Sequence, residues 1–179
     1  LDGRAFVLED HKVMLKGVGY APLAIGAQPA DAVAPCVYAR DLPLIAAMGA
    51  NTVRTYAALP AGDTAFVAVL ETTGLNWLAG FPLDRWYDPS RTLEDRREEI
   101  LAAFREYASR FRGERRLIGY IFGDDMAANY HARFAGPAQD FYSLLAGAAA
   151  VLAEGDPDGP PLLATATTRL DDLALAPAG

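Results

Sequence analysis

Two adjacent carboxylates, Asp124 and Asp125, follow the apolar run Leu117–Phe122 after a single glycine, Gly123. Interacting carboxylates raise the pKa of one member of the pair, which would suit a general acid, although the two charges could also simply repel. A structural alternative is that they cap and solvate the start of a helix at Met126. A metal role together with His131 is a further alternative, but that spacing matches no ligand motif. The pair is therefore a candidate for acid–base chemistry or sugar contact, and we predict neither a metal nor a cofactor.

An arginine lies inside a second apolar run, at Arg54, where its charge must be paired or face a polar cavity. Aromatic residues stand near the ends of three runs, at Tyr20, Tyr56 and Trp86. Aromatic faces can stack on the C–H surface of a sugar while charged groups hold its hydroxyls, so we interpret all four residues as substrate-binding. The alternatives are a structural ion pair for the arginine, packing beneath the site for the tyrosines, and anchoring of its own loop for the tryptophan.

Short apolar runs alternate with longer stretches of helical period, which is typical of βα units with a parallel sheet. The runs that predict strands are Val13–Tyr20, Asn51–Tyr56, Leu75–Phe81, Leu117–Phe122 and Pro161–Thr167. Ahead of them, Arg4–Leu8 and Lys12–Leu15 predict a β-hairpin. Because ligands bind at the carboxyl ends of parallel strands, we predict that Arg54 lies within hydrogen-bonding reach of Asp124 or Asp125.

Helical spacing of apolar residues predicts the connecting helices. The clearest helix follows Thr92 and ends before Gly113, and a second is capped by Asp63 and ends at Gly74. Two further helices are predicted over Asp41–Met48 and from Pro137 to Leu152. The segment between Phe81 and Thr92, which contains Trp86 and Tyr87, has no period and predicts a loop.

Composition limits the class of protein. The chain has 179 residues, 52% of them hydrophobic, and a net charge of -7, which argues against nucleic acid as a partner. No apolar run approaches the roughly 20 residues that a transmembrane helix needs.

The single cysteine, Cys36, has no partner for a disulfide and no companion at ligand spacing. The chain begins at Leu1, so we expect either a removed export signal or a piece of a longer protein; the compartment stays unknown, and the acidic balance favours export.

Several of these segments together resemble a known family. Met14–Tyr20, then the helix Asp41–Met48 leading into Gly49–Tyr56, then Gly74-Leu75 opening a strand, look like the front half of the TIM barrel of retaining β-glycosidases. Glycoside hydrolase family two and related glucanases are the most similar. The resemblance covers nearly the whole chain, and it implies a (β/α) barrel represented by about five of its eight strands.

The resemblance also implies roles for the turn after the fourth strand. In the family this strand ends in Gly-Asn-Glu, where the Glu is the general acid/base and the Asn binds the sugar 2-hydroxyl; the matching residues here are Gly123, Asp124 and Asp125. Aspartate places its carboxyl roughly 1 Å further back than glutamate, and a misplacement on that scale can cost about a hundredfold in rate. Retention also needs a second carboxylate about 5–5.5 Å from the first. The family carries it on the seventh strand, beyond the five predicted here.

Two hypotheses of function follow. In the first, residues 1–179 are a single, incomplete glycosidase-like barrel domain that acts on an oligo- or polysaccharide, with Asp125 as acid/base and Asp124 beside it. In the second, the domain is catalytically degenerate and serves as a sugar-binding or scaffolding module. Either could be completed by further domains of a longer parent chain or by a homo-oligomer. A doubly wound nucleotide-binding sheet is the alternative fold, but Gly17 and Gly19 lack the third glycine of that motif.

Overall fold

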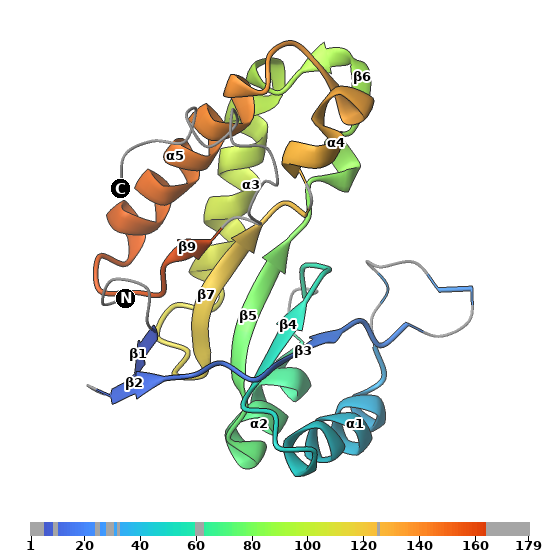
Figure 1. Ribbon diagram of the computed structural model, residues 1–179, viewed down its shortest axis with the longest axis vertical. Helices are drawn as coiled ribbons and strands as arrows, with labels where there is room; N and C mark the ends of the chain where they lie inside the picture. Colours follow the sequence, from blue (N-terminus) through green and yellow to red (C-terminus); the bar gives the residue numbers. More distant parts are fainter. Residues whose placement is uncertain are drawn as a thin grey trace.

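A five-stranded parallel sheet organises the chain, as the ribbon of the computed structural model shows (Figure 1). The structure describes residues 6–8, 11–23, 26–27, 31, 33–59, 63–124 and 126–163, with only the backbone considered at 127–129 and 131. The strands lie side by side in chain order: β3 (Gly17–Tyr20), β4 (Thr52–Thr55), β5 (Asn76–Phe81), β7 (Leu117–Phe122) and β9 (Leu162–Leu163). This order has no reversal among the described strands, unlike the switch point of a doubly wound sheet.

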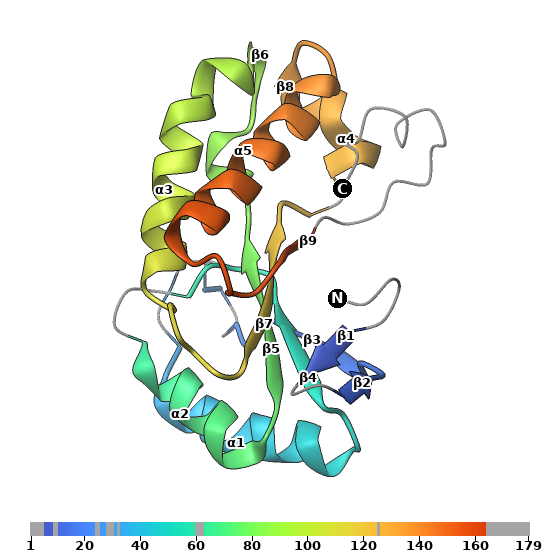
Figure 2. The same cartoon turned by 90° about the vertical axis from the view of Figure 1, so that its left-hand side faces the viewer.

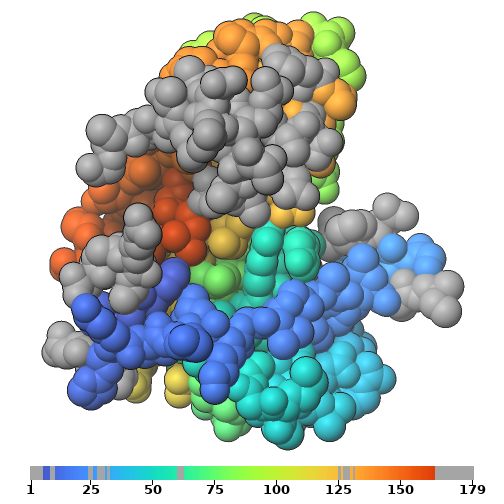
Figure 3. All heavy atoms as spheres, in the orientation of Figure 1, coloured from blue at the N-terminus to red at the C-terminus, as the bar shows by residue number. Residues whose placement is uncertain are grey.

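An antiparallel hairpin precedes the sheet. Its strands β1 (Phe6–Leu8) and β2 (His11–Val13) pair Phe6 with Val13. Figure 3 shows this hairpin and β3 running as one blue band across the face of the molecule. The mixed α/β class, the parallel sheet and the hairpin therefore agree with the sequence prediction.

Helices connect the strands. They are α1 (Pro35–Ala47), α2 (Thr64–Thr73), α3 (Arg97–Ser109), α4 (Met126–Arg133) and α5 (Gln139–Gly155). In Figure 2, α2 and α3 lie to the left of β5 and β7, and the hairpin lies to the right. Gly74 ends α2 in the left-handed conformation, with φ 72°, as a C-terminal glycine should. Among the described residues, no helix is both long enough and apolar enough to cross a membrane.

The core lies between the sheet and these helices and is unusually aromatic. Trp77 of β5 is fully buried and makes edge-to-face contacts with Phe66 of α2, at 5.3 Å, and with Phe111 just after α3, at 4.9 Å. Phe104 of α3 packs in the same way on Phe122 of β7, at 5.2 Å. Each such ring pair adds to the stabilisation that comes from burial alone, so these contacts stabilise the packing of the helices on the sheet. We call this helix-covered side the outer face of the sheet.

Two predicted boundaries are wrong, and one predicted helix cap lacks its hydrogen bond. The run Val13–Tyr20 is not one strand, because the Asn51 side chain binds the main chain of Met14 and Lys16 where it passes between β2 and β3. The helix expected at Asp41 begins earlier, with Pro35 in its first turn, where a missing N–H costs nothing. Asp63 precedes α2 but makes no side-chain capping bond; its carboxylate accepts a hydrogen bond from the Tyr38 hydroxyl at 2.7 Å.

The predicted loop between Phe81 and Thr92 is also wrong, because it contains ordered elements. A 3-10 turn, η1 (Asp84–Trp86), is followed by β6 (Asp88–Thr92), which pairs in parallel with β8 (Phe134–Ala135) just after α4. A second 3-10 turn, η2 (Glu94–Arg96), leads into α3. Of the last predicted strand, Pro161–Thr167, only the part up to 163 lies within the described residues, and it forms β9.

Candidate functional site

An ion pair joins the ends of β4 and β7. The Arg54 Nη2 donates a hydrogen bond to the Asp124 Oδ1, which confirms the predicted reach between these two residues. The arginine side chain is 23% exposed and the aspartate side chain 45%, so the pair lies at the surface of the sheet edge rather than in the core. A ligand can therefore reach it.

The sheet register places Arg54 on the face away from the helices. Arg54 pairs with Gly19 on one side and with Leu78 on the other, while its chain neighbours Val53 and Thr55 are buried. Because side chains alternate along a strand, the arginine points to the opposite side from those two residues. Its Nε is buried, and no hydrogen-bond partner for it is found among the described residues.

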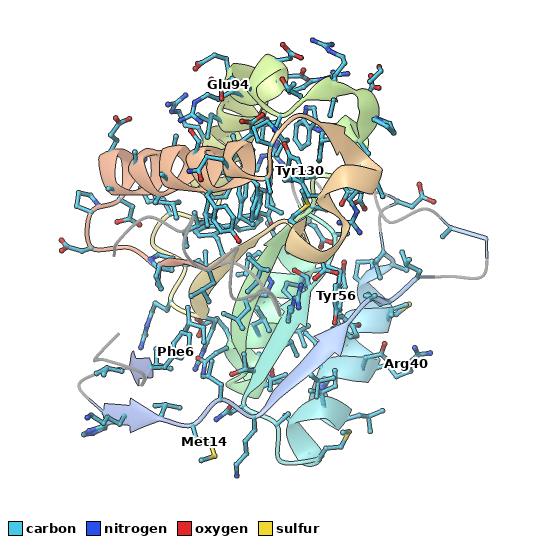
Figure 4. All side chains as sticks on the ribbon, turned by 45° about the horizontal axis from the view of Figure 1, so that its top comes forward. Phe6, Met14, Arg40, Tyr56, Glu94 and Tyr130 are labelled. Carbon is cyan, nitrogen blue, oxygen red and sulfur yellow. The ribbon has the colours of Figure 1, made fainter. Side chains whose placement is uncertain are left out.

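Tyr56 covers this arginine. The Arg54 Cζ lies 4.5 Å from the centroid of the Tyr56 ring, which is a cation–π distance. A Cβ added to Gly19 would lie 2.7 Å from the Tyr56 hydroxyl oxygen, so the ring occupies space that any side chain at position 19 would need. Gly19 therefore makes room for a ring and does not belong to a nucleotide-binding turn. Tyr56 itself is 44% exposed, and Figure 4 shows it close to the carboxyl ends of β3 and β4.

The turn after β7 carries Asp124. Gly123 has φ 71° and donates its N–H to the Phe81 carbonyl at 2.9 Å, which ties the turn to the end of β5. A Cβ on Gly123 would lie 2.6 Å from the Met126 Cγ, so both the conformation and the contact favour glycine here. Asp125, the predicted acid/base, lies outside the described residues, and so does the side chain of His131.

Tyr20 is placed apart from this ion pair. It is 7% exposed, its hydroxyl donates to the Asp41 Oδ2 at 3.2 Å, and its ring stacks on Phe66. Burial, reinforced by the nearby Asp41 carboxylate, raises the pKa of the Tyr20 hydroxyl well above its usual value. Tyr20 and Tyr56 both line an apolar pocket of about 110 Å³ beyond the ends of β3 and β4.

Trp86 also lies away from the ion pair. It is 2% exposed, its ring packs against Phe81, and its Nε1 donates to the Glu99 Oε1 at 2.8 Å. That hydrogen bond is the main reason that the pKa of the Glu99 carboxyl is lowered. The guanidinium of Arg85 covers the indole ring at 3.9 Å. In this arrangement Trp86 anchors η1 to α3 and offers no free face for stacking.

Sequence reasoning missed two residues beside Asp124. The Arg133 Nη1 of α4 donates to the Asp124 carbonyl at 2.7 Å, and its guanidinium lies 4.7 Å from the centroid of the Tyr87 ring. Burial, with a hydrogen bond to Asp84, raises the pKa of the Tyr87 hydroxyl. Arg133 stands alone in a helical stretch, so no motif or spacing in the sequence marks it.

The described part of the site has groups that can bind a ligand, but it has one carboxylate where a retaining mechanism needs two. An exposed aromatic ring, a guanidinium and an aspartate together can stack on and hydrogen-bond a polyhydroxylated ligand. Within the described ranges, no three histidine, cysteine or acidic side chains gather closely enough to hold a metal ion. The arrangement is thus one of charged and aromatic groups at the edge of a parallel sheet.

Comparison with known proteins defines the fold and not the family. No protein-family model matches the sequence, and no curated protein matches it. Among solved structures, the chain is similar to a β-D-mannosidase from Dictyoglomus thermophilum, with a TM-score of 0.61 and 17% sequence identity over 89% of this chain. The match covers 20% of that enzyme, so the chain spans about one fifth of its length. The chain therefore has a glycosidase-like α/β fold.

Proposed function

We propose that this chain is part of a carbohydrate-active domain of the retaining β-glycosidase type, in which its five strands belong to a (β/α)8 barrel. The observation that carries the proposal is the Arg54–Asp124 ion pair beneath the exposed Tyr56 ring, at the carboxyl edge of the parallel sheet. Ligands of parallel α/β folds bind at this edge. The likeness in fold to a β-mannosidase supports the same class of ligand, an oligo- or polysaccharide.

Each residue of the site has a role in this proposal. The Tyr56 ring stacks on the C–H face of one sugar, while Arg54 and Asp124 donate to and accept from its hydroxyls. Asp125, in its protonated form, gives a proton to the oxygen of the leaving group and later takes one from the attacking water. A second carboxylate, about 5–5.5 Å from the first, attacks the anomeric carbon and forms the glycosyl-enzyme intermediate. In this proposal the nucleophile lies outside the five described strands, as it does in the family that the sequence resembles.

The second candidate function is sugar binding without turnover. It is favoured by the residues of the turn, where two aspartates stand in place of the Asn-Glu of the family that the sequence resembles. It is also favoured by the ion pair between Asp124 and Arg54, which already engages a carboxylate oxygen of the one described acidic residue in this turn.

Hydrolysis of aryl β-glycosides separates the two functions. The complete open reading frame that encodes this sequence is expressed and assayed for release of p-nitrophenol from the β-mannoside, β-glucoside and β-galactoside. We expect release from at least one of these, and loss of release in Asp125→Asn, because an amide is far too weak an acid to protonate the leaving oxygen. Glu114→Gln, at a charged residue before β7, serves as the control for loss of a carboxylate. Sugar binding without turnover in the complete protein would instead establish the second function.

Removing the guanidinium should weaken sugar binding in either function. Arg54→Met is expected to raise the Kd for the best methyl β-glycoside about 10- to 150-fold, because a hydrogen bond to a charged group contributes about 1.5–3 kcal/mol. Arg40→Met, which removes an exposed arginine of α1 paired with Asp41, is the matched control and should leave the Kd unchanged. Isothermal titration calorimetry gives both values. Equal affinities in Arg54→Met and the unaltered protein would rule out a site at this ion pair.

A further inference from the structure

Two arginines bind Asp124. Arg133 binds its main chain, and Arg54 binds its side chain. The Nη1 of Arg133 donates to the Asp124 carbonyl oxygen at 2.7 Å, while the Nη2 of Arg54 donates to the Asp124 carboxylate. The two arginines come from α4 and β4, which lie far apart in the sequence. Asp124 is thus fixed from two directions, once through its backbone and once through its side chain.

Arg133 is itself held against Tyr87 and Met126. Its guanidinium faces the Tyr87 ring at 4.7 Å, and its Nη1 lies 3.6 Å from the Met126 Sδ. The Tyr87 hydroxyl is 3.8 Å from the same sulfur, and the Tyr87 ring packs edge-on against Phe134 at 5.5 Å. Met126 is 1% exposed, so these contacts rest on a buried side chain. The arginine therefore has little freedom to move away from the turn.

The Gly123 N–H ties the turn to the end of β5, but that bond does not fix the side chain of the residue that follows. Gly123 has positive φ and no side chain, and glycine allows the following residue to swing more freely than any other residue would. The side chain of Asp124 is 45% exposed, so its bond to Arg54 competes with water. A charge-assisted hydrogen bond to the carbonyl of the same residue restricts that movement without occupying the carboxylate.

We propose that Arg133 is a positioning residue, which holds the turn after β7 so that the Asp124 carboxylate stays against Arg54 and presents one fixed edge to the sugar. This inference rests on the proposed function for its consequence in sugar binding. The positioning itself is independent of any ligand. Arg133 touches neither the proposed sugar nor the reacting atoms, and it acts through Asp124.

A mutant cycle without ligand tests the positioning. The free energy of unfolding is measured for the unaltered protein, Arg54→Met, Asp124→Asn and the double variant, and the same four proteins are then made with Arg133→Met. We expect the coupling between positions 54 and 124 to fall by at least half when Arg133 is absent, because the carboxylate no longer stays in reach. Methionine keeps the apolar stem beside Tyr87, so packing is largely preserved. An unchanged coupling would overturn the proposal.

Sugar binding provides the readout that a merely structural role would not move. In Arg133→Met, the Kd for the methyl β-glycoside is expected to rise about 2- to 10-fold, the effect of one hydrogen bond, with partial recovery in Arg133→Lys, which keeps a donor. Arg110→Met, which removes an exposed arginine just after α3 that pairs with Glu106, is the control and should bind normally. If Arg133→Met and Arg110→Met bind alike, the positioning role is wrong. Failure of the unaltered protein to bind any sugar overturns the proposed function instead, and the ligand-free cycle still decides the role of Arg133.

Discussion

Replacing Trp77 with alanine is expected to lower the free energy of unfolding by about 3–5 kcal/mol, the usual cost of removing a large aromatic side chain from a core. Trp77 is fully buried at the centre of the outer face of the sheet, with Phe66 and Phe111 packed edge-on against it. Its Nε1 also donates to the Thr55 Oγ1 at 3.0 Å, and Thr55 is itself buried. The variant therefore creates a cavity and removes a hydrogen bond at the same place. Urea unfolding followed by circular dichroism measures the loss.

Trp77→Phe is the matched control for this prediction. It keeps a ring between Phe66 and Phe111 but removes the indole N–H, and the Thr55 hydroxyl still accepts from the Gly80 N–H at 3.2 Å. We therefore expect it to lose clearly less stability than Trp77→Ala. Equal losses in the two variants would mean that the hydrogen bond, and not packing, dominates at this position.

Replacing Gly80 with alanine should also destabilise the protein strongly, by about 2–3 kcal/mol, because overpacking forces the backbone to move. A Cβ at this position would lie 2.2 Å from the Thr55 carbonyl oxygen and 2.9 Å from that of Tyr56. Both are main-chain atoms of the segment that leads from Arg54 to Tyr56, so they cannot turn aside as a flexible side chain would. The same variant should weaken sugar binding, because it displaces the two residues that the proposed site depends on.

Gly17→Ala supplies the comparison. Gly17 is also a strand glycine, but the nearest atom to an added Cβ is the Thr52 carbonyl oxygen at 3.9 Å, an ordinary contact. We expect its stability to change by no more than about 0.5–1 kcal/mol, in either direction. Thermal unfolding of the two variants side by side measures the difference. Similar melting temperatures would show that the segment after β4 can shift away from β5 at little cost.

The ion pair between Arg54 and Asp124 could be predicted because the meeting of these two residues depends only on the direction of two strands. Parallel neighbours bring their carboxyl ends to one edge, whatever the details of their pairing. The strands could be predicted from the sequence as well, since each is a short apolar run bounded by turn residues. The long helix after Thr92 could also be predicted. The Thr92 and Asp95 side chains each accept a hydrogen bond from the other residue's backbone N–H at 3.1 Å, in the manner of a capping box.

The orientation of Tyr20 could not be predicted because it depends on register. Tyr20 pairs with Thr55, one position beyond Arg54, so it points to the helix side of the sheet with Thr55 and not to the side of the arginine. A shift of one residue would reverse that, and nothing local in the sequence specifies the shift. The pairing of β6 with β8 was missed for a related reason, since Asp88 and its neighbours have low β-propensity and their partners come from beyond α4.

The small β6–β8 ladder joins the two segments that follow β5 and β7. The segment 82–96 follows β5 and the segment 123–138 follows β7, and the ladder ties them together through Asp88 with Phe134 and Thr92 with Ala135. The conformation of each segment therefore depends on that of the other. A chimera that replaces one of these segments alone would leave the other segment's ladder strand unpaired, so the two segments have to be exchanged together.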